Sequence, residues 1–138
     1  MFRSIKDGDF DCFLLAGRYT LLEQDSLDEF FPVCEKRNVV VVIRGSYNSG
    51  ILATVSKKEA KINYAPAPEH IRERVRQIEK CCNDYEVTLA AATLQFVLVL
   101  PNIPTVIPGT RTVDQLKRNI ELIDENIPLD FWESLKQR

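Results

Sequence analysis

The sequence has few of the residues on which metal centres depend. Among its 138 residues there is one histidine, His70, and the four cysteines form no C-x-x-C pair. We therefore predict no metal site, because neither residue type occurs at ligand spacing. We interpret Cys12, Cys34, Cys81 and Cys82 as reduced thiols rather than disulfide partners, which is typical of a cytoplasmic protein.

Long hydrophobic runs and an excess of positive charge are absent as well. The longest apolar stretch, VTLAAATLQFVLVLP, is too short to span a bilayer and carries Thr and Gln, so we interpret it as a buried helix. The charged segment MFRSIKDGDF lacks the apolar region of a secretory signal. A net charge of -2 and a pI near 5.5 argue against nucleic-acid and membrane-surface partners.

Two nucleotide-binding signatures, G-x-G-x-x-G and Walker A, are also missing, so Rossmann and P-loop interpretations lack support. What is present is 45% hydrophobic and 28% charged residues. This composition is typical of one globular domain, here residues 1–138, with enough apolar material for a core.

Apolar runs alternate with amphipathic segments along the chain. DCFLLAGRY (11–19), whose apolar run is ended by Gly17, and VVVVI (39–43) are continuous apolar runs, which predict strands buried on both faces. TVIP (105–108) predicts a third, short strand. Between the second and third lies RGSYNSGILATVSKKEAKINYAPAP (44–68), a Gly-, Ser- and Pro-containing loop whose length indicates a function beyond connection.

Helices are predicted between and after these strands. SLDE places Ser26 at an N-cap in a capping box with Glu29, and Thr112 forms a second box with Gln115. The segment after Thr112 carries an apolar stripe of Val113, Leu116, Ile120 and Ile123. Further helices are predicted after Pro68, over 88–100 and in the tail PLDFWESLKQR, whose Phe131, Trp132 and Leu135 are expected to cover an end of the core.

Strands that alternate with helices predict parallel pairing, with function at the carboxyl ends of the strands. RGSYNSG follows the second strand and PGTRT follows the third. Glycine, serine and threonine at such ends, with a helix N-terminus and the guanidinium groups of Arg111 and Arg118, favour a phosphate-containing ligand. Surface loops of this composition are also common without any ligand, so both interpretations stay open at this point.

Four segments, LLAGRYTLLEQ, YNSGILA, YAPAP and VIPGTRTVDQLKRN, together resemble the C-terminal part of the aldo-keto reductase superfamily. The branch they resemble holds D-threo-aldose 1-dehydrogenase and the L-fucose, galactose and pyridoxal dehydrogenases. The resemblance implies an α/β fold: the C-terminal part of a (β/α)8 TIM barrel, with three parallel strands and flanking helices. It also implies hydride transfer between NAD or NADP and a carbonyl or sugar lactol carbon.

The resemblance further implies which residues bind the cofactor. Those expected at the pyrophosphate, in the loop after the second strand, are Gly45, Ser46, Tyr47 and Ser49. Those expected at the adenosine are Gly109, Thr110 and Arg111 beside the 2'-hydroxyl or 2'-phosphate, with Gln115 and Asn119 at the ribose and adenine. Gly109 and Gln115 stand where many NADP-preferring members have Lys and Arg, so NAD is expected at least as much as NADP.

The family's catalytic Asp, Tyr, Lys and His belong to the first half of the barrel, which has no counterpart here, so no catalytic residue is assigned. A barrel of this class needs about 250 residues. We therefore interpret the sequence as a C-terminal fragment, an internal-start product or a separately encoded piece, inactive alone. The alternatives are a non-catalytic NAD(P)-binding domain and a degenerate fragment without a ligand.

Three barrel strands leave two unpaired edges and a face without cover. We therefore expect low solubility, self-association or association with a complementary N-terminal half-barrel. A sugar or aldehyde substrate is expected only in such a completed enzyme.

Overall fold

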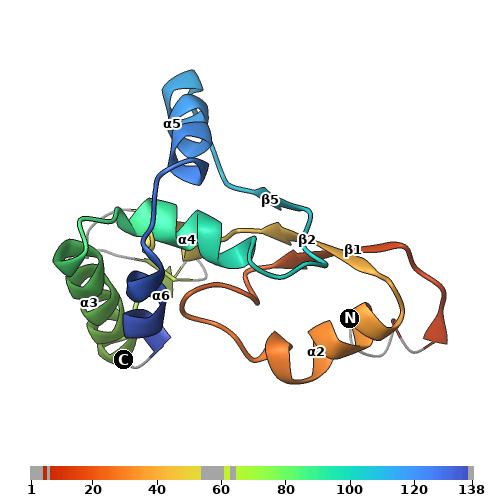
Figure 1. Cartoon of the computed structure of the whole chain (residues 1–138). Coiled ribbons are helices and arrows are strands. Elements are labelled where there is room, and N and C mark those ends of the chain that lie inside the picture. The colour runs from red at the N-terminus through yellow and green to blue at the C-terminus, as the bar shows by residue number, and fades with distance from the viewer. Residues whose placement is uncertain (1–4, 6, 54–60, 63–64, 137–138) are drawn as a thin grey trace.

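The computed structural model describes residues 5, 7–53, 61–62 and 65–136. A parallel sheet lies at its centre (Figure 1), formed by β1 (Cys12–Ala16), β2 (Val40–Arg44) and β5 (Thr105–Ile107) in the order β1-β2-β5. The structure thus has the predicted α/β class with three parallel strands, and the first strand ends at Ala16, directly before Gly17, where the sequence predicts its end. It ends there because the next residue, Gly17, turns the chain with a φ of 59°.

Five helices follow the predicted order within the described residues: α2 (Ser26–Lys36), α3 (Glu69–Asp84), α4 (Leu89–Val97), α5 (Val113–Ile123) and α6 (Leu129–Lys136). The predicted loop over 44–68 holds three short elements that its composition did not reveal. They are a 3₁₀ turn, η1 (Asn48–Gly50), and two antiparallel strands, β3 (Lys61–Ile62) and β4 (Ala65–Pro66). Tyr64 of the YAPAP motif lies outside the described residues.

The sheet is buried on one face only, which corrects the prediction that its strands are covered on both. Leu15, Val41 and Ile43 are buried against α2 and the end of α4. Leu14 and Ile107 alternate with them and are exposed, and Arg44 is exposed on the same side. The continuous apolar runs therefore encode two buried faces, but within the described residues only one of them meets cover.

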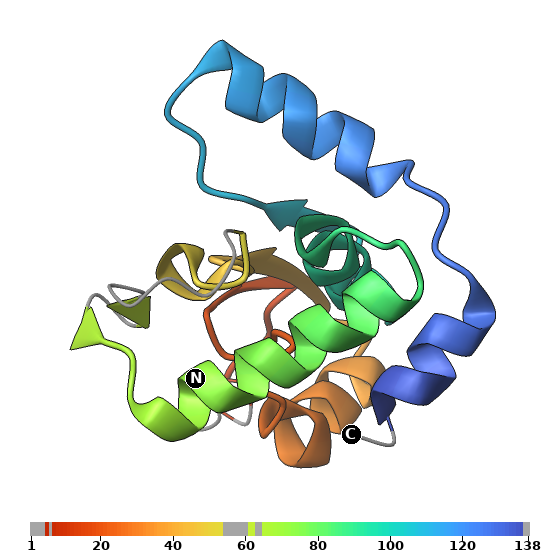
Figure 2. The same ribbon diagram turned by 90° about the vertical axis from the view of Figure 1, so that its left-hand side faces the viewer.

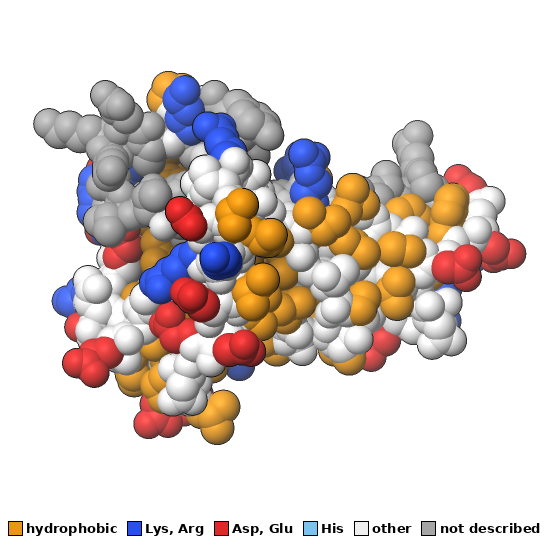
Figure 3. All heavy atoms as spheres, turned by 90° about the horizontal axis from the view of Figure 1, so that it is seen from above, with side chains coloured by type: hydrophobic (Ala, Val, Ile, Leu, Met, Phe, Trp, Pro, Cys, Tyr) orange, Lys and Arg blue, Asp and Glu red, His pale blue; other side chains and the backbone are white. Residues whose placement is uncertain are grey.

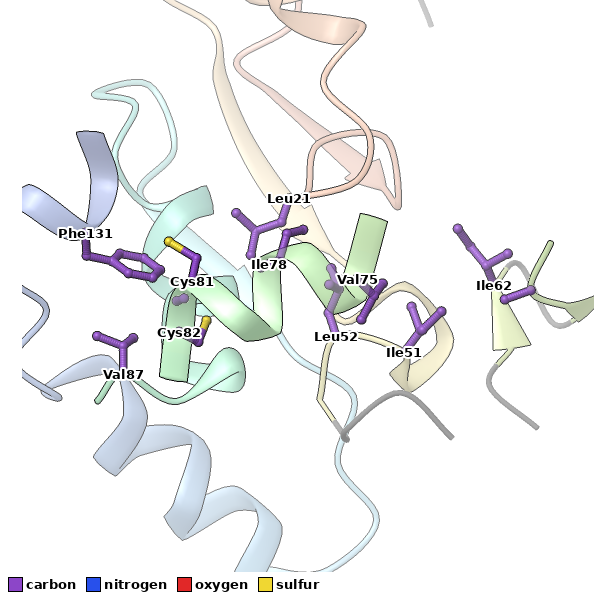
Figure 4. Packing of buried hydrophobic residues seen from close by; sticks show 12 residues of the cluster. Leu21, Ile51, Leu52, Ile62, Val75, Ile78, Cys81, Cys82, Val87 and Phe131 are labelled. Carbon is purple, nitrogen blue, oxygen red and sulfur yellow. The ribbon is translucent and has the colours of Figure 1, made fainter. Parts of the chain in front are cut away.

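A second apolar cluster lies among α3, α4 and α6 (Figure 2) and includes Val75, Ile78 and Cys82 of α3 and Phe131 of α6. Figure 4 shows the cluster extending along α3, with Phe131 beside Cys81 at one end and Leu52, from the segment after η1, beside Val75 further along. Trp132 and Leu135 pack against the same cluster. The predicted role of the tail, to cover an end of the core, is confirmed.

Of the two predicted N-cap residues, one caps its helix and the other does not. Thr112 caps α5 as predicted, because its Oγ1 accepts a hydrogen bond from the backbone N–H of Gln115 at 3.2 Å. Ser26 does not cap α2: Asp25 occupies that position, and Ser26 Oγ instead donates to the carbonyl of Arg18 at 2.7 Å. The serine therefore anchors the segment that follows β1 rather than the helix end.

Three further features of the described residues bear on the predictions. The apolar helix predicted over 88–100 begins at Leu89, with Thr88 as its N-cap, and ends at Val97. No helix in the described ranges is both long enough and apolar enough to cross a bilayer. All four cysteines are thiols; Cys34, Cys81 and Cys82 are buried, whereas Cys12 is exposed.

Candidate functional site

The two loops singled out by the sequence begin side by side. Arg44, the last residue of β2, pairs in register with Ile107, the last residue of β5. The segments that follow, 45–50 and 108–112, therefore leave the sheet at the same edge, at the carboxyl ends of parallel strands. This is where α/β proteins place their ligands.

The loop after β2 is a tight structure with several left-handed residues. Gly45 has a φ of 72°, and Asn48, Ser49 and Gly50 follow at 45°, 61° and 99°. Asparagine and glycine tolerate this conformation, whereas serine adopts it less readily. A Cβ at Gly45 would make only an ordinary contact, 3.8 Å from the backbone nitrogen of Gly17, so the positive φ rather than crowding favours glycine there.

This loop buries polar atoms that have no hydrogen-bond partner among the described residues. They are the hydroxyl of Ser46 and both the oxygen and the nitrogen of the Asn48 side-chain amide. A buried polar group without a partner costs about 1–3 kcal/mol. The loop therefore has unused hydrogen-bond donors, the Ser46 hydroxyl and the Asn48 side-chain nitrogen, which are the kind of group that binds an anionic oxygen. Asn48 was not among the predicted site residues; its neighbours Ser46 and Ser49 were.

The segment after β5 uses part of its own hydrogen-bonding capacity. The N–H of Gln115 is held by Thr112, and the Gln115 side-chain oxygen accepts from the backbone N–H of Arg111 at 2.7 Å. The first turn of α5 also contains Asp114. An anion would therefore meet the guanidinium group of Arg111, which is exposed, more readily than it would meet the backbone of the helix start.

One hydrogen bond joins the two segments. The hydroxyl of Tyr47 donates to Oδ1 of Asn119 on α5 at 2.7 Å, across 72 residues of sequence. Asn119 is buried, so its amide holds Tyr47 in place and is not presented to solvent. Burial raises the pKa of Tyr47 to about 12, although the positive charge of Arg118 acts in the opposite direction. Tyr47 therefore keeps its hydroxyl proton at neutral pH and can donate it to Asn119.

The other predicted residues of the segment after β5 lie at the surface. Gly109 and Thr110 are exposed at the start of the second segment. Arg118 lies in the middle of α5, and its Nη1 is 3.8 Å from a carboxylate oxygen of Glu121. The structure thus brings Tyr47 and Asn119 into contact, and it places Gly109, Thr110 and Arg111 on the surface at the same end of the sheet.

The two best-defined hollows among the described residues lie away from the predicted site residues. The best-defined hollows among the described residues have volumes of about 280 and 310 Å³. The first lies between α2 and residues 100–102, and the second is lined by Asp9, Phe10 and Arg37. Neither includes a predicted site residue.

Within the described residues, no side chain is arranged as a general acid, and no group of three or more potential ligands is placed to hold a metal. Burial raises the pKa of Tyr19 to about 12, and Tyr47 shows the same shift. Both shifts make the phenol a weaker acid, opposite to the direction a proton donor at neutral pH requires. His70 is exposed in the first turn of α3, away from both loops.

Three parallel strands with flanking helices define the class of protein, an α/β protein. The sequence profile of the aldo/keto reductase family matches residues 2–137. The chain belongs to the aldo/keto reductase family, a family of oxidoreductases.

Two curated relatives agree with this assignment. Pyridoxal 4-dehydrogenase of Microbacterium luteolum is 41% identical over 133 residues, which cover 96% of this chain and 39% of the relative. D-threo-aldose 1-dehydrogenase of a Pseudomonas species is 32% identical over 136 residues, or 98% of this chain and 41% of the relative. The chain therefore spans about two fifths of the length of these relatives.

Solved structures show the same fold. Aldo-keto reductase AKR11C1 from Bacillus halodurans, in its apo and holo forms, superposes with TM-scores of 0.73 and 0.74 at 20% identity. The superposition covers 98% of this chain and 45% or 44% of the solved one. The three strands and their helices are therefore part of a larger barrel fold.

Proposed function

We propose that the chain is the NAD(P)-binding portion of an aldo-keto reductase-type oxidoreductase and has no turnover of its own. The hydrogen bond from Tyr47 to Asn119 carries the proposal, because it joins the loop after β2 to the helix after β5. A dinucleotide is long enough to need both segments, and the bond holds them in one arrangement.

In this proposal the loop after β2 takes the pyrophosphate. Gly45, Ser46, Tyr47 and Ser49 supply a closely turned backbone, and the unpaired Ser46 hydroxyl is a donor that a phosphate oxygen would satisfy. Tyr47 holds the loop in place rather than binding the phosphate through its hydroxyl, because that hydroxyl already donates to Asn119.

The segment after β5 takes the adenosine end. Arg111 lies between Thr110 and the cap of α5, and its guanidinium group suits a 2'-hydroxyl, a 2'-phosphate or the face of adenine. Gly109 and Gln115 offer no positive charge for a 2'-phosphate, so we propose NAD or dual use rather than strict NADP preference. Asn119 contributes by fixing Tyr47.

When bound, a nicotinamide dinucleotide would supply or accept the hydride. The chain's own part would be to hold the pyrophosphate and adenosine, since the pKa shifts of Tyr19 and Tyr47 oppose a role as proton donor. A substrate of the aldose or pyridoxal type, as the relatives' names state for those enzymes, would require the rest of the barrel.

Titration of NADH and NADPH fluorescence tests the proposal. We expect saturable enhancement without turnover of pyridoxal or an aldose, and about tenfold weaker binding in Arg111→Ala, because a charge-assisted hydrogen bond contributes about 1.5–3 kcal/mol. Lys80→Ala removes one positive charge from the exposed side of α3 and should leave the affinity unchanged. Equal binding by Arg111→Ala would remove the assigned role of Arg111.

A ligand-free fragment is the competing interpretation. The occupied N–H groups at the start of α5 and the absence of a cleft at the described site residues favour it. Monodisperse protein that binds neither nucleotide would decide for that alternative.

A further inference from the structure

Three surfaces without a partner lie next to one another in the described structure. The first is the face of the sheet opposite α2, where Leu14 is 50% exposed and Ile107 is 49% exposed. Figure 3 looks onto this side of the molecule and shows hydrophobic side chains gathered there. An apolar sheet face of this kind is normally covered in a parallel sheet.

The second surface is the apolar stripe of α5. Val113 is 68% exposed and Ile120 is 58% exposed, and Leu116 and Ile123 continue the stripe. The helix contacts α4 through its other side, where Leu122 packs with Ala91 and Leu94. Figure 1 shows α5 projecting from the body of the molecule, so the stripe is presented to solvent.

The third surface is the outer edge of β5. Among the described strands β5 pairs only with β2, which leaves its other edge without a neighbour. An unpaired edge presents N–H and C=O groups that another strand can bind. The connection from β5 leads directly to α5, so a strand added here would bring its own helix towards the stripe.

We propose that these three surfaces bind one occupant, the N-terminal portion of an aldo-keto reductase barrel. One strand of that portion would pair with β5, its helix would cover Val113 and Ile120, and the other strands would close over Leu14 and Ile107. The lengths agree, because a barrel of this class has eight strands and the described sheet has three. The chain also covers only 39–45% of the relatives and solved structures it matches.

The charge on the bare face favours this occupant over a second copy of the chain. Arg44 lies on that face, and its other residues, such as Leu14 and Val42, carry no acidic group. Two copies that met face to face would bury two guanidinium groups without a counter-charge, which is costly. We therefore infer that the occupant supplies an acidic group to Arg44.

Cys12 provides a built-in probe of this cover. It begins β1 on the bare face, in register with Val40, and is exposed, whereas the other three thiols are buried. In native protein a maleimide should therefore modify Cys12 first. A polypeptide that closes over the sheet should slow this reaction.

The experiment co-expresses the full chain with the N-terminal part of the Microbacterium luteolum relative, the part that its match to this chain leaves out. Without added nucleotide, we expect the two to co-purify and Cys12 labelling to slow at least tenfold against the isolated chain at a concentration where it is monomeric. Leu14→Asp and Ile120→Asp should abolish both effects. Leu129→Asp replaces an exposed apolar residue on α6 and should change neither.

A covalent fusion of the same two segments decides the case in which the separate N-terminal segment is insoluble. A folded fusion with protected Cys12 supports the proposal. A fusion that stays aggregated, or one in which Cys12 reacts as fast as in the isolated chain, overturns it. A stable dimer of this chain with protected Cys12, unchanged by the segment, assigns the surface to a second copy and also overturns it. None of these readouts involves nucleotide, so they are independent of the proposed cofactor role.

Discussion

Glu125 accepts two hydrogen bonds from Thr88, one from the backbone N–H at 2.9 Å and one from Oγ1 at 3.0 Å. Thr88 is the N-cap of α4, and Glu125 lies just after α5. The carboxylate therefore sits at the positive end of the α4 dipole and ties the end of one helix to the start of another. Gln95 strengthens the link, because its Nε2 donates to the carbonyls of Leu122 and Glu125.

Replacement of Glu125 by Ala should destabilise the chain by about 1–3 kcal/mol, because the backbone N–H of Thr88 loses a charged acceptor. Urea unfolding measures the effect. Glu121→Ala is the matched control: that carboxylate is exposed and lies 3.8 Å from Arg118, so its loss should cost less than about 1 kcal/mol. Equal effects of the two substitutions would show that the link between α4 and α5 contributes nothing.

Tyr47→Phe should weaken nucleotide binding more than it weakens the fold. The substitution keeps the ring but leaves Oδ1 of the buried Asn119 without its donor, so the two candidate loops are no longer held together. We expect a loss of about 1 kcal/mol in unfolding free energy and a several-fold loss of NADH affinity. Tyr85→Phe removes a hydroxyl from the α3 end of the core, and it should leave NADH affinity unchanged. An unaltered NADH affinity in Tyr47→Phe would show that the hydrogen bond to Asn119 does not contribute to nucleotide binding.

Alkaline pH should destabilise the chain through Tyr19. Burial raises its pKa from 10.0 to about 12, so the folded state holds the proton more tightly than the unfolded state does. The contribution to stability is complete below pH 10 and is lost as pH rises towards 12, and two pKa units correspond to about 3 kcal/mol. Tyr19→Phe keeps the ring contacts with Phe31 and Phe96 and should reduce this loss in unfolding measured from pH 8 to 11, while Tyr47, whose pKa burial also raises to about 12, keeps its own contribution. An equal pH slope in both proteins would assign the loss to other groups.

The sequence was most informative where local chemistry alone decides the structure. The β-branched run at 39–43 lies within one residue of β2, and Thr112 caps α5 as its spacing with Gln115 predicts. Ser26 also has the spacing of a cap, but the carbonyl of Arg18 takes its hydroxyl. No local pattern contains that contact, because it depends on how the segment after β1 returns to the helix.

The candidate site shows the same division. Composition and resemblance pointed to both loops, yet the contact between Tyr47 and Asn119 joins positions 72 residues apart and appears only in the fold. The exposed apolar residues of β1 and α5 show the converse case, in which the sequence pattern predicts contacts that the described structure does not contain. Leu14 and Ile120 have the apolar character of buried residues, because the pattern encodes partners that the described chain does not provide.

These exposed residues lead to a prediction for the isolated chain. An apolar sheet face beside an apolar helix stripe is a surface that promotes association, so we expect concentration-dependent oligomers or low solubility in size-exclusion chromatography with light scattering. The double variant Leu14→Lys with Ile120→Lys places a charge on each surface and should shift the protein towards monomer without lowering its melting temperature, since both side chains are at least half exposed. Leu129→Lys adds charge at an exposed apolar position on α6 and should leave association as it is. A wild-type chain that elutes as a sharp monomer at every concentration and melts cooperatively would contradict the prediction, because it would show that these surfaces need no cover.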